Sequence, residues 1–133
     1  MATLTPTLTL TSAAGDITSD SLAVSVSDAL TIKAPAQGLS TVIADSTGAN
    51  NIIVPPTGGI TTYIFIRHTG TTNGSTTTSV QVDVEETGDA MFARLAAGEW
   101  LYLPFNHHAG NVGVQLQSTG ASVQMEYAFW TKS

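Results

Sequence analysis

The feature that most constrains the fold is a strict alternation of polar and apolar residues, which begins at the N-terminus. Within residues 3–11 (TLTPTLTLT), threonines occupy every odd position. The even positions carry Leu4, Pro6, Leu8 and Leu10. A period of two places these sets on opposite faces of a half-buried β-strand. Pro6 cannot donate a ladder hydrogen bond, so we expect residues 1–15 to form an edge strand or extended arm whose apolar residues contact a partner.

The same period recurs along the rest of the chain, with turn residues between the segments. We expect strands at residues 22–32, 42–43, 52–54, 60–68, 79–86, 89–98, 99–105, 112–117 and 122–130. Residues 60–68 are apolar on both faces and should form a central strand that is covered on both sides. Asp28 should mark a bulge or turn, and Asn73-Gly74 should form a turn in the exposed loop 69–78. The crowded apolar residues of 89–98 also allow a short helix, although a strand is favoured. Eight or nine short strands predict an all-β fold, an antiparallel β-sandwich of jelly-roll type, with residues 16–133 as one domain. An immunoglobulin-like sandwich stays an alternative.

Charge is scarce, with four basic and ten acidic residues and a net charge of -6. The four cations are scattered, which argues against binding nucleic acid, because a polyanionic backbone needs clustered Lys and Arg. There is no cysteine and no long apolar run, so neither a disulfide framework nor a membrane partner is expected. The N-terminus has no signal-peptide pattern. A charge-poor, Thr-rich exterior suits contact with neighbouring subunits.

Two adjacent histidines, His107 and His108, are the first candidates for chemistry. On a strand, adjacent side chains point to opposite faces, although on a loop the pair could converge with His68 on a metal. No acidic residue lies near His107 in sequence to orient its imidazole. We therefore expect His107 and His108 to be solvent-facing or subunit-contact residues. We expect no metal, no cofactor and no catalytic residues, although a non-standard calcium site formed by loop acids stays open.

The aromatic residues of the second half allow two interpretations. They are Trp100, Tyr102, Phe105, Tyr127, Phe129 and Trp130. A sugar-stacking platform is one possibility, and a sandwich core with the surplus facing a subunit is the favoured one. Trp130 is out of phase with Tyr127 and Phe129, so we expect it outside the core, at an interface or under the N-terminal strand.

The second half, over about residues 60–131, also resembles small virion structural proteins of tailed bacteriophages, which include the head decoration (cement) proteins. In that group a Gly-Glu-aromatic strand ending in proline is followed by a polar turn and a final strand of the form Glu-Tyr-Ala. The matching residues here are Gly98, Glu99, Trp100, Pro104, Glu126, Tyr127 and Ala128.

The resemblance implies a homotrimeric β-sandwich that is made in the host cytoplasm and binds the major capsid protein on the outside of the virion head. There it would stabilise the capsid lattice and catalyse no reaction. A tail, baseplate or fibre component of the virion is the first alternative. A carbohydrate-binding, lectin-like module is the second.

Overall fold

The computed structural model describes residues 2–17, 19–48, 52–53, 61–87, 91–106 and 113–133. Throughout these ranges every regular element is a β-strand, and the sheets are antiparallel, which confirms the expected all-β fold. The chain divides into two compact units, Met1–Lys33 with Ser133, and Ala34–Lys132.

The strands are β1 (Ala2–Leu4), β2 (Thr7–Ser12), β3 (Leu22–Ser27), β4 (Leu30–Ala44), β5 (Ile52–Ile53), β6 (Thr62–His68), β7 (Thr71–Thr72), β8 (Thr76–Thr77), β9 (Val82–Glu86), β10 (Met91–Leu95), β11 (Trp100–Phe105), β12 (Val114–Ser118) and β13 (Val123–Lys132).

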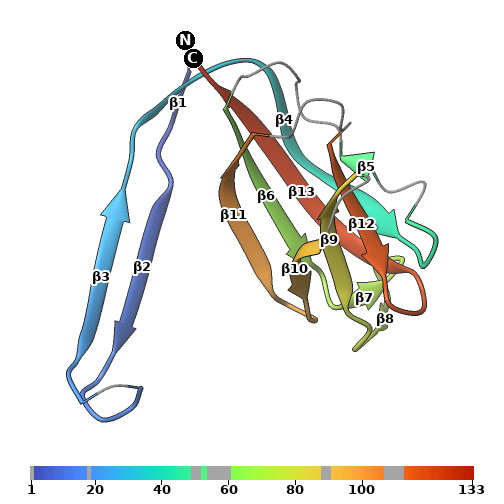
Figure 1. Ribbon diagram of the computed structural model, residues 1–133, viewed down its shortest axis with the longest axis horizontal. Coiled ribbons are helices and arrows are strands. Elements are labelled where there is room, and N and C mark those ends of the chain that lie inside the picture. Colours follow the sequence, from blue (N-terminus) through green and yellow to red (C-terminus); the bar gives the residue numbers. More distant parts are fainter. Residues whose placement is uncertain (1, 18, 49–51, 54–60, 88–90, 107–112) are drawn as a thin grey trace. The chain divides into compact units, whose positions relative to one another are not determined.

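The larger unit is built from two sheets, in the strand orders β4-β13-β6-β11 and β10-β9-β12-β5. Figure 1 shows β6 in green between β11 in orange and β13 in red. The segment 60–68, which is apolar on both faces, was expected as a central strand, and that position is confirmed. The segment 89–98 contains the strand β10, so the strand interpretation is correct and the helix is not formed.

The core lies between these two sheets, because alternate residues of each contribute to one buried cluster. Its members include Ile64, Ile66, Val82, Val84, Val114, Leu116, Val123 and Met125. The period of two in the sequence thus becomes one buried face on each sheet, as in a β-sandwich. Fully burying an aliphatic side chain of this kind contributes about 1.5–3 kcal/mol.

The polar side chain of His68 is completely buried at the end of β6. Its Nε2 donates to the Val80 carbonyl at 2.8 Å, and its Nδ1 accepts from the Gly70 amide at 2.9 Å. A carbonyl can only accept and an amide N–H can only donate, so the imidazole is neutral with its proton on Nε2. The ring ties the end of β6 to the segment that leads into β9.

The expected turn at Asn73-Gly74 is confirmed. Asn73 has φ 48° and Gly74 has φ 78°, the pair of positive angles that a type I′ turn requires. The turn joins β7 to β8, a short hairpin where an exposed loop without strands was expected.

The smaller unit differs from the expected arm at residues 1–15. β2 pairs along its whole length with β3, from Thr7 opposite Ser27 to Ser12 opposite Leu22. Residues 16–33 therefore belong to the same unit as the arm. The expectation that β2 is half-buried was wrong, since Leu8 and Leu10 are exposed. A two-stranded hairpin has no second layer to cover one face.

The segment 22–32 was expected as one strand and forms two, β3 and the start of β4. The interruption falls at Asp28, where a bulge or turn was expected, and the Asp28 amide donates to the Pro6 carbonyl at 3.3 Å. Pro6 itself lies between β1 and β2. The expected short strand at 42–43 is the end of the 15-residue β4, whose first residues pair with β1.

We predict that His68→Phe lowers the free energy of unfolding by about 1–3 kcal/mol, because the Val80 carbonyl and the Gly70 amide lose their partner. Chemical denaturation followed by circular dichroism measures the change. Thr76→Ser, on exposed β8, serves as the control and should unfold like the wild type. An unchanged midpoint for His68→Phe would show that water replaces both hydrogen bonds.

Candidate functional site

The residues expected to contact a partner lie in different parts of the molecule. Leu4, Pro6, Leu8 and Leu10 belong to the smaller unit. Trp130 lies on β13 in the larger one, and it is absent from the core cluster, as expected. His107 and His108 lie outside the described residues, so the expectation for them stays a prediction.

Trp130 is part of a surface on the side of its sheet that faces away from the core. Three strands contribute alternate residues to this side, in rows fixed by the register of β13 with β6 and of β6 with β11. The rows are Trp130–Tyr63–Pro104, Ala128–Phe65–Tyr102 and Glu126–Arg67–Trp100. We call these nine residues the aromatic face.

The aromatic face is partly open to solvent. Trp100 is 55% exposed, and Tyr63, Phe65, Tyr102 and Trp130 are half-buried. The rings of Tyr63 and Tyr102 are stacked, with centroids 5.8 Å apart and planes 25° from parallel. Five aromatic side chains thus form one contiguous apolar surface on adjacent strands.

One ion pair borders this surface. Arg67 Nη2 lies 2.7 Å from Glu126 Oε2, and the Arg67 side chain is 48% exposed. An ion pair this accessible contributes little to folding stability, because solvent screens it. Trp, Tyr and Arg are the residue types that most often dominate binding energy at protein interfaces.

The outer side of the second sheet carries polar and charged residues. Beside the buried Val82 and Val84, β9 turns Asp83 and Glu85 outward. Asp83 accepts hydrogen bonds from Arg94 on β10, with 3.1 Å between Oδ2 and Nη2, and this interaction raises the pKa of Arg94. We call this side the polar face. The aromatic face departs from the polar outer side that a sandwich normally has.

The hairpin of β2 and β3 carries a second apolar surface. Its five residues share one side of the ribbon: Leu8, Leu10, Leu22, Val24 and Val26. Four of them are exposed, Val26 by 56%. Ser12 shares that side, and the other side carries the threonines, Ser25, Ser27 and Ala23. We call the five residues the aliphatic face of the hairpin.

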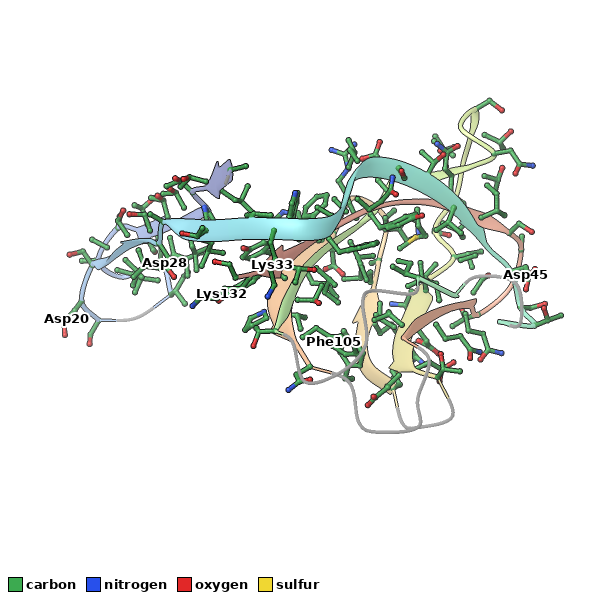
Figure 2. All side chains as sticks on the ribbon, turned by 90° about the horizontal axis from the view of Figure 1, so that it is seen from above. Asp20, Asp28, Lys33, Asp45, Phe105 and Lys132 are labelled. Atoms are coloured by element: carbon green, nitrogen blue, oxygen red, sulfur yellow. The ribbon has the colours of Figure 1, made fainter. Side chains whose placement is uncertain are left out.

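The strands of the hairpin contain no charged residue. Figure 2 shows Asp20 in the loop that joins β2 to β3, and Asp28 at the end of β3. Charge in this unit therefore sits at the ends of the ribbon, and its aliphatic face can be covered without removing a charge from water.

The motif GEW at residues 98–100 has a structural explanation in its first two residues. Gly98 has φ 84°, a backbone conformation that disfavours a side chain. The Glu99 carboxylate accepts from the Ala96 amide at 2.8 Å, and the Glu99 amide donates to the Ala96 carbonyl at 3.0 Å. This turn joins β10 in one sheet to β11 in the other and delivers Trp100 to the aromatic face.

The aromatic set named from the sequence divides between two locations. Phe105, Tyr127 and Phe129 pack against the core, which was the favoured interpretation. Trp100, Tyr102 and Trp130 lie on the aromatic face. Sequence reasoning missed Tyr63, Phe65 and Arg67. The available signal was their position in β6, where they alternate with aliphatic residues.

The described residues include no group of three or more His, Asp and Glu side chains placed to hold a metal ion. His68 uses both ring nitrogens in hydrogen bonds to the backbone, so neither is available to a metal. Across the same residues there is no helix with the length and hydropathy that a membrane crossing requires.

Comparisons of the chain with models of known protein families and with curated protein sequences find no match. The resemblance to phage virion proteins therefore stays a prediction that depends on the residues quoted for it.

We predict that substitution by threonine has very different effects on stability at two adjacent residues of β11. Trp100→Thr should change the free energy of unfolding by less than about 0.5 kcal/mol, because the side chain touches solvent. Leu101→Thr should lower it by about 1–3 kcal/mol, since Leu101 packs against the core. Equilibrium denaturation of both variants tests this. A large loss for Trp100→Thr would assign the aromatic face to folding.

Proposed function

We propose that this chain is a virion structural protein of a tailed bacteriophage, a decoration protein that binds the outside of the head and stabilises the capsid lattice. Its partners are the major capsid protein and further copies of itself, as a homotrimer. The aromatic face carries the proposal. A soluble domain rarely leaves a contiguous apolar surface on its outside unless something binds there.

The residues behind the sequence resemblance support the same surface. Trp100, Pro104, Glu126 and Ala128 belong to the aromatic face. Gly98 and Glu99 form the turn that leads into it. The pattern shared with phage proteins thus describes an outward-facing surface more than a core.

The strand order supports a jelly roll. The eight strands of the sandwich are β4, β5, β6, β9, β10, β11, β12 and β13. Numbered 1 to 8 in chain order, they form sheets with the strand orders 1-8-3-6 and 5-4-7-2. Every connection except the one from β9 to β10 joins a strand of one sheet to a strand of the other. Jelly rolls are common in viral capsid and lectin domains. Because a fold alone does not determine function, the choice between a capsid protein and a lectin depends on what the aromatic face binds.

The physical role of such a protein is multivalent binding. Each copy contributes a modest contact, and linked copies dissociate from a lattice much more slowly than single ones. A surface poor in charge also keeps the desolvation cost of that contact low. The proposed role requires no catalytic residue.

We predict that the purified protein co-sediments with heads assembled from the major capsid protein encoded in the same genome, and that decorated heads retain DNA to a higher temperature. The combined variant Phe65→Thr and Trp100→Thr should bind at least about tenfold more weakly, the effect of losing about 1.4 kcal/mol. Glu85→Gln, on the polar face, is the matched control. Failure of the wild-type protein to bind heads would refute the proposal, and binding to tails would move it to the first alternative.

A carbohydrate-binding module is the second candidate, favoured by the exposed Trp100 and the stacked pair Tyr63 and Tyr102. Sugar rings stack on such side chains, and Arg67 and Glu126 could hydrogen-bond their hydroxyls. A glycan array, followed by melting temperatures with each hit, tests it. We expect no sugar-dependent shift. A shift of several degrees that Trp100→Thr abolishes would favour this candidate.

A further inference from the structure

We propose that the aliphatic face of the hairpin packs on the aromatic face of a second copy of this chain. The inference deepens the proposed function, on which it rests for its biological setting. The contact itself forms between free copies of the protein and needs no capsid. In this assembly the aromatic face joins the copies, so substitutions on it weaken head binding by removing linked copies and not by removing a direct contact with the capsid.

The hairpin needs a covering layer. A two-stranded ribbon is at best marginally stable in water, and it becomes stable when its apolar side packs against another layer. Leu8, Leu10 and Val26 are exposed on the hairpin, so its two strands do not cover the aliphatic face by themselves.

The aromatic face offers an apolar surface on which such a hairpin can pack. It is the outer side of a sheet whose inner side already forms the core. Each chain therefore carries one apolar ribbon and one apolar sheet surface, and a second copy satisfies both without any third component. Because the two surfaces differ, the contact is heterologous, and it gives a ring if the rotation between copies closes and an open filament if it does not.

The two surfaces match in size and chemistry. β2, β3 and β11 each have six residues, a length of about 20 Å at about 3.3 Å per residue. The hairpin strands carry no charge, and the aromatic face carries one ion pair, at its Trp100 end. Aliphatic side chains can pack on the aromatic rings, and the hairpin strands bring no charged group that would have to leave water.

The area of the contact favours a closed assembly. A ribbon about 20 Å long and roughly 10–15 Å wide covers about 200–300 Å² on each partner, or about 400–600 Å² in total. Specific interfaces bury about 1,200–2,000 Å². One contact falls short of this range, so a single pair of copies is weakly bound. A closed assembly, in which each copy makes two such contacts, dissociates more slowly than a pair.

The absence of cysteine from the sequence makes crosslinking a clean test. Val26→Cys on the hairpin and Trp100→Cys on the aromatic face are prepared as separate proteins, one of them tagged so that mixed dimers have their own mass. After mixing, a short bismaleimide should join the two variants in high yield. Any such product links two copies, because each chain has a single thiol.

The controls place the thiol on surfaces outside the proposed contact. Ser25→Cys, on the Thr and Ser side of β3, should not react with Trp100→Cys above background. Glu85→Cys, on the polar face, should not react with Val26→Cys. Mixed dimers of equal yield from the control pairs, or none from the test pair, would overturn the proposed contact.

Light scattering after size exclusion provides the second readout. The wild type should be a trimer, and Leu8→Thr, Leu10→Thr and Val26→Thr together should raise the concentration of half-assembly at least about tenfold. The combined variant Phe65→Thr and Trp100→Thr should do the same with its hairpin sequence intact. Thr7→Ser, Thr9→Ser and Ser25→Thr together change the opposite side of the ribbon and should leave the mass unchanged. A monomeric wild type overturns the inference.

Failure here is distinguishable from failure of the proposed function. Protein that binds heads but neither assembles nor crosslinks in solution would remove this inference alone. Protein that assembles and crosslinks as described, but does not bind heads, would remove the decoration role and leave the contact between copies in place.

Discussion

The rest of the structure depends on the position of β6, a strand with apolar residues on both faces and a paired neighbour on each side. Ile64 and Ile66 face the second sheet and anchor the core. Tyr63 and Phe65 face the other way and belong to the aromatic face. A central strand of this kind normally lies between two layers. The sandwich provides one of them, and assembly with other molecules would provide the second.

Periodicity in the sequence was sufficient to predict the class of fold and most of the strands, because burial of one face of a sheet imposes a period of two on the residues. It could not predict which strands pair. The sequence predicts an edge strand or free arm for the β2 segment, since nothing local to residues 3–11 specifies that Leu22–Ser27 will lie beside it. Register is defined by two paired strands, so it cannot be predicted from the sequence of one strand alone.

The candidate surface was predicted in part for the same reason. Trp130 was placed outside the core from its phase within β13. Tyr63 and Phe65 were read as buried because apolar residues on both faces of a strand usually mean two covered faces. The aromatic face becomes visible only when β13, β6 and β11 are aligned, since each strand contributes no more than three of its residues. The turn at Gly98 and Glu99 sets where Trp100 enters that alignment.

The uncharged hairpin has a consequence for the protein before it assembles. β2 and β3 each have one unpaired edge, and neither carries the lysines or inward charges that usually prevent edge-to-edge association. Newly made copies would therefore be prone to join through these edges into open-ended aggregates. The net charge of -6 opposes this by mutual repulsion. Solubility of the free chain thus depends on ionic strength. Added salt weakens that repulsion, so association through the unpaired edges of β2 and β3 becomes more favourable.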